Sequence, residues 1–204
     1  MWFMWRRVIK CLMAVIMVVV GVGCNNEEDA VDSQRQNIIR FLTSTHEPRL
    51  ISQSEVESSL ESDPPFYERL DYNVYRYIAT YYDQGRSSRK EIKWGDKVEL
   101  TYVGFRFTGS KFNLGDVYST NDESILAQLE EAGLDGQYWA TEPLSIVFGQ
   151  SNIIKGVETS LNGCREGDVV EVYMTYEAAY DKNVVGIMPK ESAIAWIYSI
   201  DKVN

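Results

Sequence analysis

The stretch that decides the fold is Glu142–Gly163, which reads EPLSIVFGQSNIIKGVETSLNG. Its first part, residues 144–148, carries a bulky apolar side chain at every second position, a period typical of a strand with one buried face. Gly149 interrupts that pattern, and apolar residues then recur at helical spacing over residues 153–161. The sequence therefore predicts a strand that leads into a short apolar helix, and this helix needs an apolar surface to pack against.

Other segments supply that surface. Alternation of apolar and polar residues predicts strands at residues 74–80, 97–107, 117–121, 169–175 and 193–203. Before residue 143, capping-box spacing from Thr120 to Glu123 predicts a second helix, which Gly133 ends. Together these elements predict an α+β fold in which an antiparallel sheet packs on the short helix.

The first 23 residues have the composition of a secretory signal. A basic start with Arg6, Arg7 and Lys10 is followed by an uncharged apolar run that stops just before Cys24. That run is too short for a membrane span, which takes about 20 residues, although a stable N-terminal anchor helix is the alternative. We therefore predict a signal peptide at residues 1–23.

Cys24 is the predicted lipidation site. The sequence Val-Gly-Val-Gly that precedes it resembles the lipobox of bacterial lipoproteins, except that Gly21 stands where leucine is preferred. The acidic run Asn25–Asp29 resembles the segment after the acylated cysteine in surface-exported lipoproteins of the Bacteroidetes, but it is equally typical of a soluble linker. The resemblance implies an acyl anchor in the cell envelope, most simply in the outer membrane on its periplasmic or surface face.

A polar segment separates the predicted anchor from the predicted domain. We expect residues 24–65 to be an acidic, polar tether with a short helix of low stability at Asp32–Thr43, and His46 to be solvated. The folded domain is then expected to begin near Phe66 and to run to residue 204. Tyr75 and Tyr77 are expected to be ordinary strand or surface residues of this domain.

Charge and composition exclude several functions. The formal net charge is −10, and loss of three positive charges with the signal would make it −13. Such an acidic chain does not hold a nucleic-acid backbone, so we expect no nucleic acid among its partners. The single His46 and the lone Cys164 of the processed chain offer no zinc site and no nucleophile–base pair, so no metal or cofactor is expected. Cys164 is expected to pack as a small apolar residue.

The order of motifs over residues 95–203 resembles the FKBP-type peptidyl-prolyl isomerases. The motifs that carry the resemblance are Gly95–Gly104, Val117–Asn121, Pro143–Gly149, Ile153–Glu158, Gly167–Asp168, Tyr176–Tyr180 and Gly186–Pro189. The resemblance implies a half-wrapped antiparallel sheet around a short helix, with a shallow apolar pocket between them. It also implies isomerisation of proline-containing polypeptides, which here would be exported or envelope proteins.

The resemblance assigns a set of residues to that pocket. They are Tyr102, Tyr118, Leu144, Ile153, Ile154, Val157, Tyr180, Ile187 and Trp196. The Ile153–Ile154 pair would offer a backbone N–H to a ligand carbonyl, and the Tyr180 hydroxyl would bind the ligand by a second hydrogen bond. Phe112 is the alternative to Tyr118 for the aromatic residue that begins the flap, the segment that borders the pocket in this family. Core packing is the alternative role for the apolar members of the set.

Two residues depart from the family pattern. Val157 stands where the most active members have a tryptophan on the pocket floor. Ser119, or Asn113 in the alignment that uses Phe112, stands where they have an aspartate. We expect the smaller floor to leave a looser cavity and the lost carboxylate to remove a hydrogen-bond anchor. The hypotheses are therefore an envelope-anchored isomerase or foldase, and a weak or inactive peptide-binding or assembly lipoprotein of the same fold. An unrelated α+β lipoprotein is the remaining alternative.

Overall fold

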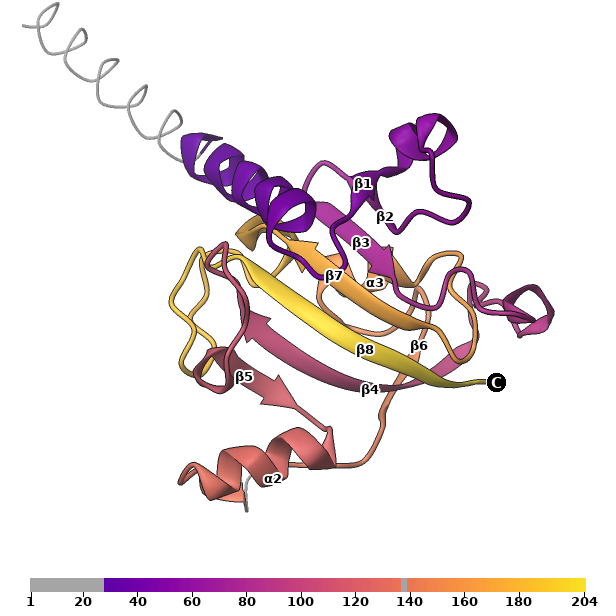
Figure 1. Cartoon of the computed structure of the whole chain (residues 1–204). Helices are drawn as coiled ribbons and strands as arrows, with labels where there is room; N and C mark the ends of the chain where they lie inside the picture. Colours follow the sequence, from indigo (N-terminus) through magenta and orange to yellow (C-terminus); the bar gives the residue numbers. More distant parts are fainter. Residues whose placement is uncertain (1–27, 137–138) are drawn as a thin grey trace, which may run out of the picture.

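The computed structural model describes residues 28–136 and 139–204 (Figure 1). The predicted signal peptide and Cys24 lie outside the described residues. The described chain opens with a helix over residues 28–44, and the remaining helices are α2 (Glu123–Glu131) and α3 (Lys155–Leu161). Short 3₁₀ turns lie at Gln53–Ser58, Arg86–Ser88, Leu114–Asp116 and Tyr176–Ala178.

The strands form one eight-stranded sheet in the order β1-β2-β3-β7-β8-β4-β5, with β6 paired to β4. Their bounds are β1 Ile51–Ser52, β2 Phe66–Asp71, β3 Val74–Ile78, β4 Lys97–Arg106, β5 Val117–Thr120, β6 Leu144–Val147, β7 Val169–Met174 and β8 Ile194–Val203. All pairs are antiparallel except β1 with β2. The predicted α+β fold is confirmed, and the sheet gains β1 and β2, which the sequence did not indicate.

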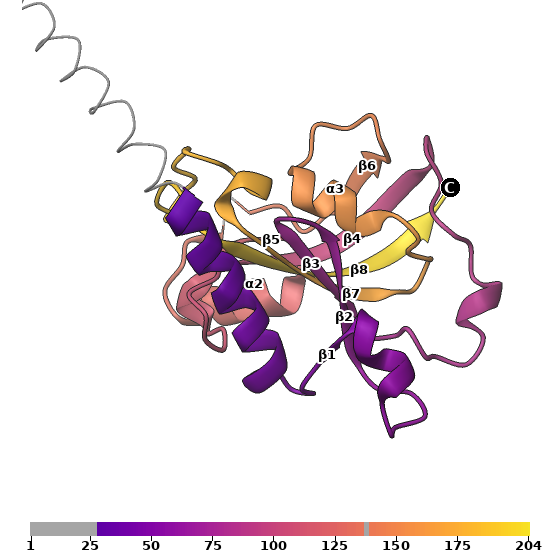
Figure 2. The same cartoon turned by 90° about the horizontal axis from the view of Figure 1, so that it is seen from above.

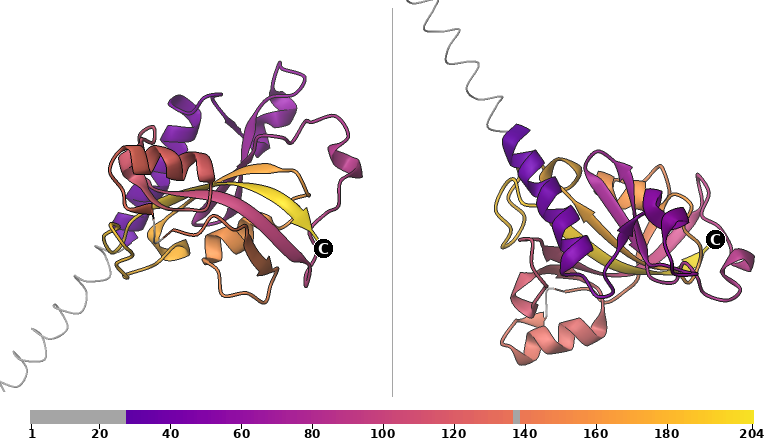
Figure 3. Two further views of the ribbon diagram at one scale, coloured as in Figure 1. Left: turned by 90° about the horizontal axis from the view of Figure 1, so that it is seen from below. Right: turned by 45° about the horizontal axis from the view of Figure 1, so that its top comes forward.

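The two faces of the sheet bury different clusters of side chains. α3 covers one face and the helix of residues 28–44 covers the other, as Figures 2 and 3 show. Alternate residues of a strand point to opposite faces, so Val172 and Met174 of β7 pack under α3 while Tyr173 between them packs under the N-terminal helix. The sheet therefore has helices on both sides, and α2 lies beside β5 at one edge of the molecule (Figure 1).

The helix of residues 28–44 corrects the predicted solvated tether. It is longer than expected, and Ile38, Phe41 and Leu42 are buried against the sheet with Tyr75 and Tyr77. His46 is also buried, and its Nε2 lies 2.9 Å from Oε2 of Glu171 on β7. The packed structure therefore begins well before Phe66. Ile38, Ile39 and Leu42 predicted a helix here, but the surface that this helix covers is a face of the sheet formed by residues far away in the sequence.

α3 is held against the sheet at both ends. At its C-terminal end, Nη1 of the buried Arg76 on β3 donates to the carbonyl oxygens of Ser160 and Asn162 at 2.7 and 2.6 Å. This cation satisfies carbonyls that have no partner within the helix. At its N-terminal end, a Cβ on Gly156 would lie 2.4 Å from Sδ of Met174, so only glycine permits this approach to β7. The position of α3 decides where the candidate site lies.

Candidate ligand-binding site

Most of the residues that the family resemblance assigned to the pocket meet in one cluster between α3 and the sheet. Val157 and Trp196 are buried in it, and the partly buried residues packed around them include Tyr102, Tyr118, Leu144, Ile153, Ile154 and Tyr180. Ile187 is not brought into this cluster, because its side chain is 65% exposed. The adjacent Met188 packs there instead and is 1% exposed.

An aromatic wall forms where β4 and β8 pair. The rings of Tyr102 and Trp196 are stacked, with centroids 4.1 Å apart and planes 3° apart. Gly104 pairs with Trp196 across the two strands, and a Cβ on this glycine would lie 3.0 Å from both the indole Nε1 and the Tyr118 ring. Because Gly104 has no side chain, the rings of Trp196 and Tyr118 can lie directly over β4 at this position.

A directed chain of hydrogen bonds links three of the aromatic side chains. Nε1 of Trp196 donates to the Tyr118 hydroxyl oxygen at 2.6 Å, and the Tyr118 hydroxyl in turn faces the Tyr180 oxygen at a longer 3.4 Å. Burial raises the pKa of both tyrosines, so both are neutral over the physiological range. Because Tyr180 accepts in this chain, its own hydrogen remains available to donate to a ligand carbonyl.

The expectation that Ser119 leaves the flap without an anchor differs from the structure. Oγ of Ser119 lies 2.8 Å from the Tyr102 hydroxyl oxygen. Ser119 on β5 thus forms a neutral hydrogen bond with Tyr102 of the aromatic wall, although a serine brings no charge. Phe112, the competing candidate for the flap, stacks on Phe105 with centroids 4.4 Å apart and packs toward Phe41 under the N-terminal helix. Tyr118 is therefore the flap aromatic that lies in the cluster.

The N-terminal end of α3 presents a backbone donor. Ile154 is the residue just before the helix, and no side chain caps this end. Among the described residues, no group accepts a hydrogen bond from the Ile154 N–H. Its side chain is partly buried in the cluster that also contains Tyr102 and Trp196. An unpaired N–H at a helix start is a ready donor for a carbonyl oxygen.

Two residues that the sequence analysis placed only at the end of a strand and the start of a helix hold the Tyr102 backbone. Asn121 is 5% exposed; its Oδ1 accepts from the Tyr102 N–H at 2.7 Å, and its Nδ2 donates to the Leu100 and Glu142 carbonyls at 2.9 and 3.0 Å. Thr120 donates to the Tyr102 carbonyl at 2.7 Å. A polar residue directly after a strand was the available signal, but it did not reveal these partners.

The segment after α2 reaches the edge of this site. Trp139 and Ala140 line a hollow of about 270 Å³ together with Tyr102, Tyr118, Ser119 and Thr120. Trp139 is partly buried and packs against the cluster that contains Val103, Phe105 and Val117 of β4 and β5. The segment between β5 and β6 therefore adds a wall beside Tyr118.

The described residues offer little other chemistry. Within ranges 28–136 and 139–204, no group of histidine, cysteine and acidic side chains could hold a metal ion, and no helix is long and apolar enough to cross a membrane. Cys164 is buried, and burial raises the pKa of its thiol to about 12, so it is protonated and unreactive. The candidate site described above consists of apolar side chains and hydrogen-bond donors.

The fold and the site together define an α+β domain with an aromatic wall beside a short helix. The sequence pattern described as FKBP-type peptidyl-prolyl cis-trans isomerase matches residues 88–197, which is more than half of the chain. The chain therefore belongs to the FKBP-type peptidyl-prolyl cis-trans isomerase family.

One protein and one solved structure are similar to this chain. FK506-binding protein 1A of Neurospora crassa is 28% identical over 112 residues, which cover 54% of this chain and 74% of that protein. Among solved structures, the N-terminal domain of FKBP42 from Arabidopsis thaliana matches with a TM-score of 0.46 at 14% identity. That match covers 72% of this chain and 95% of the other.

Proposed function

We propose that this chain is an FKBP-type prolyl isomerase or foldase, anchored in the bacterial envelope through an acylated Cys24 and acting on exported polypeptides or envelope proteins. The observation that carries the proposal is that two hydrogen-bond donors belong to the same apolar cluster. The Tyr180 hydroxyl is linked through Tyr118 to Trp196, and Ile154, whose N–H has no acceptor among the described residues, packs in that cluster as well.

The reaction needs no more than such a wall. Prolyl isomerisation breaks no bond, and its barrier of about 18–20 kcal/mol comes from the conjugation of the amide. A catalyst must therefore bind the twisted amide more tightly than the planar one. The stacked rings would hold the pyrrolidine ring away from water, while the Ile154 N–H and the Tyr180 hydroxyl would each donate to a carbonyl of the client. All the side chains involved are neutral, so no proton transfer is required.

A refolding experiment tests the isomerase part. The parent chain should accelerate the slow, proline-limited refolding phase of an unrelated protein. Tyr180→Phe should lower that acceleration about tenfold or more, because one preorganised donor is lost. Tyr72→Phe is the matched control, because the Tyr72 side chain is 58% exposed and has no place in the proposed site. Equal rates for the two variants would remove Tyr180 from the mechanism.

A second candidate function rests on the floor of the site. Val157 is completely buried and supplies no indole from α3, which favours a peptide-binding or assembly lipoprotein with weak catalysis or none. Val157→Trp would force an indole into a packed cluster, at a cost of about 1–3 kcal/mol of stability. If a folded Val157→Trp variant isomerises prolyl bonds and the parent does not, the binding function is the correct one for the natural chain.

The anchoring part has its own test. Residue 28 is already helical in a helix that packs on the sheet. Four residues span at most about 14 Å, so an acyl group at Cys24 would keep the domain close to the bilayer. Cells that express the chain and are fed a labelled fatty acid should transfer label to the parent and to Cys164→Ser, but not to Cys24→Ser. Label on Cys24→Ser, or none on the parent, would contradict acylation at this residue.

A further inference from the structure

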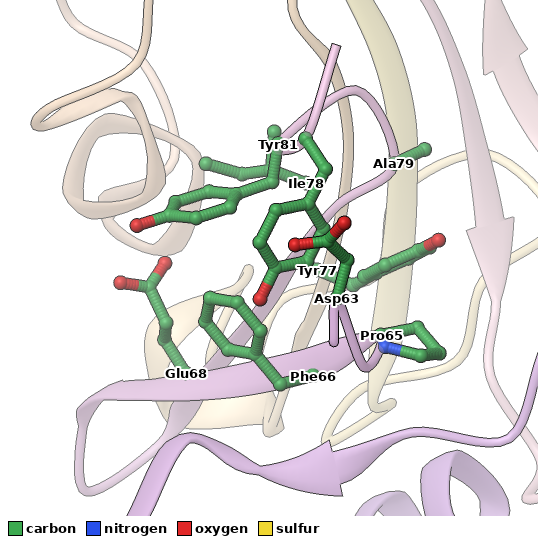
Figure 4. Close-up of a pocket in the computed structure, with 9 residues that line it drawn as sticks. Asp63, Pro65, Phe66, Glu68, Tyr77, Ile78, Ala79 and Tyr81 are labelled. Atoms are coloured by element: carbon green, nitrogen blue, oxygen red, sulfur yellow. The ribbon is translucent and has the colours of Figure 1, made fainter. Parts of the chain in front are cut away.

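A second hollow lies at the far side of the sheet, where β2 begins and β3 ends. Its volume is about 200 Å³, and Figure 4 shows the side chains around it. The lining residues are Asp63, Pro65, Phe66, Glu68, Tyr77, Ile78, Ala79, Tyr81 and Tyr82. None of them belongs to the residues assigned to the isomerase site, and Glu68 is bound to Arg76, the residue that holds the C-terminal end of α3. The hollow is therefore a separate feature of the fold.

Three aromatic rings make a corner of this hollow. Phe66 contacts Tyr81 with ring centroids 5.0 Å apart and Tyr82 at 6.2 Å, and Tyr81 contacts Tyr82 at 5.0 Å. The three interplanar angles are 78°, 68° and 80°, so the rings stand nearly perpendicular to one another. Phe66 is buried and forms the floor, while Tyr81 and Tyr82 are 41% and 43% exposed and form the walls.

Negative charge accompanies the rings. Figure 4 shows the carboxylates of Asp63 and Glu68 directed toward the same space as the rings of Phe66 and Tyr81. Glu68 is neutralised by Arg76, whose Nε lies 2.7 Å from its Oε2. Asp63 is exposed, and it forms no ion pair with any residue in the described part of the chain. Asp63 lines the hollow together with Tyr82, and burial raises the pKa of the Tyr82 hydroxyl.

The chain itself uses one of these rings to hold a cation. The guanidinium carbon of Arg86 lies 4.9 Å from the centroid of the Tyr81 ring. This guanidinium also donates to the fully buried Asp168 at 2.8 and 2.7 Å, so its charge is already balanced. Tyr81 is therefore placed where its electron-rich surface attracts positive charge, and the hollow adds two further rings and the charge of Asp63.

We propose that this hollow binds an alkylammonium group. Perpendicular rings surround a rounded cation such as a methylated ammonium, whereas a planar guanidinium prefers parallel stacking on a ring face. The volume lies below the roughly 300–1,000 Å³ of pockets for drug-sized ligands, so it fits a headgroup or the end of a lysine side chain. The strongly acidic chain favours cationic ligands in general. The ammonium could come from a free small molecule or from a lysine of a polypeptide.

The test compares choline with 3,3-dimethylbutan-1-ol, which has the same shape without the charge. The full chain is kept in a maltoside detergent, which contains no ammonium group, and binding is followed by saturation transfer to the methyl protons. We expect choline to bind at least about tenfold more tightly than the neutral alcohol. Peptides with lysine or trimethyllysine, titrated in parallel, distinguish a side chain from a free headgroup by their relative affinity.

Variants locate the binding within the molecule. Tyr82→Leu should weaken choline binding about fivefold, because one aromatic wall is lost, while Tyr82→Phe should stay within about twofold of the parent. Both substitutions are at a partly exposed side chain, and matching thermal unfolding curves would establish that the variants fold. Equal binding of choline and the alcohol, no choline binding by the folded chain, or unchanged binding in Tyr82→Leu would each overturn the proposal.

Discussion

The indole Nε1 of Trp196 donates a hydrogen bond to the hydroxyl oxygen of Tyr118 across 2.6 Å, over the backbone of Gly104. This bond joins β8 to β5 and orients the Tyr118 hydroxyl toward Tyr180. Trp196→Phe keeps an aromatic ring but removes the donor, so we expect the free energy of unfolding to fall by about 1–2 kcal/mol and isomerase activity to fall several-fold.

Trp94→Phe is the matched control for that change, because the Trp94 side chain is 74% exposed. Chemical denaturation and the isomerase assay should show that Trp94→Phe matches the parent in both quantities. Trp196→Phe with full activity would mean that the bond to Tyr118 serves packing alone.

The N–H donor of Ile154 can be removed by a proline substitution without breaking a hydrogen bond among the described residues. Its φ of −55° suits proline, and its N–H has no acceptor among the described residues. Ile154→Pro should therefore unfold near the parental denaturant concentration but lose about tenfold in kcat/KM. Ile154→Val retains the N–H and should lose much less. If the two variants have the same activity, the backbone donor takes no part in binding the client.

The bond between Ser119 and Tyr102 predicts coupled substitutions. Ser119→Ala and Tyr102→Phe should each cost about 1 kcal/mol of stability, and the double variant should cost little more than either alone. Ser145→Ala, at an exposed serine on β6, should change stability by less than about 0.5 kcal/mol. Strictly additive losses in a denaturant series would show that the two hydroxyl groups do not interact.

His46 should make the attachment of the N-terminal helix depend on pH. Burial lowers the pKa of its imidazole, but Glu171 at 2.9 Å and the Pro48 carbonyl at 2.5 Å outweigh that effect, and the pKa is raised. Glu47 adds a smaller contribution in the same direction. Because the pKa of the imidazole is higher in the folded chain than in the unfolded chain, protonated His46 stabilises the fold. This stabilisation is complete at a pH below the unfolded pKa of about 6.5, and it is lost as the pH rises through the folded pKa.

The stability difference between the parent and His46→Asn should therefore be larger at about pH 6 than at about pH 9. In a Glu171→Gln background, the effect of His46→Asn on stability should change much less between these two pH values, because the imidazolium then lacks its charged partner. Urea unfolding at a series of pH values measures both effects. A difference that is constant with pH would show that His46 stays neutral in the folded chain.

The periodicity of apolar residues predicted most of the strands and α3. The strand predicted at residues 144–148 is β6, and α3 and most of the long strands also follow the apolar pattern, because a single buried face imposes that period. Long-range partners were not predictable in this way. The apolar residues Ile38 and Leu42 do not indicate which surface their helix covers. The sequence around the polar Asn121 likewise gives no sign that its side chain links β4 to Glu142.

The candidate site shows the same division. Tyr102 and Trp196, which the family pattern assigned to the pocket, stack on each other in the fold. Residues in loops follow no such periodicity, and their placement depends on the fold. In the loop before β8, Ile187 and Met188 are equally apolar, and only the fold decides that Met188 is buried and Ile187 exposed.

The most direct test of the central claim is an NMR exchange measurement on a short Xaa-Pro peptide with the full chain. The uncatalysed cis–trans exchange takes tens of seconds or longer. The account predicts exchange cross-peaks on the seconds timescale with the parent chain, weaker by about tenfold or more with Tyr180→Phe and unchanged with Tyr72→Phe. Exchange at the uncatalysed rate in a well-folded parent sample would contradict isomerase activity and leave a peptide-binding domain.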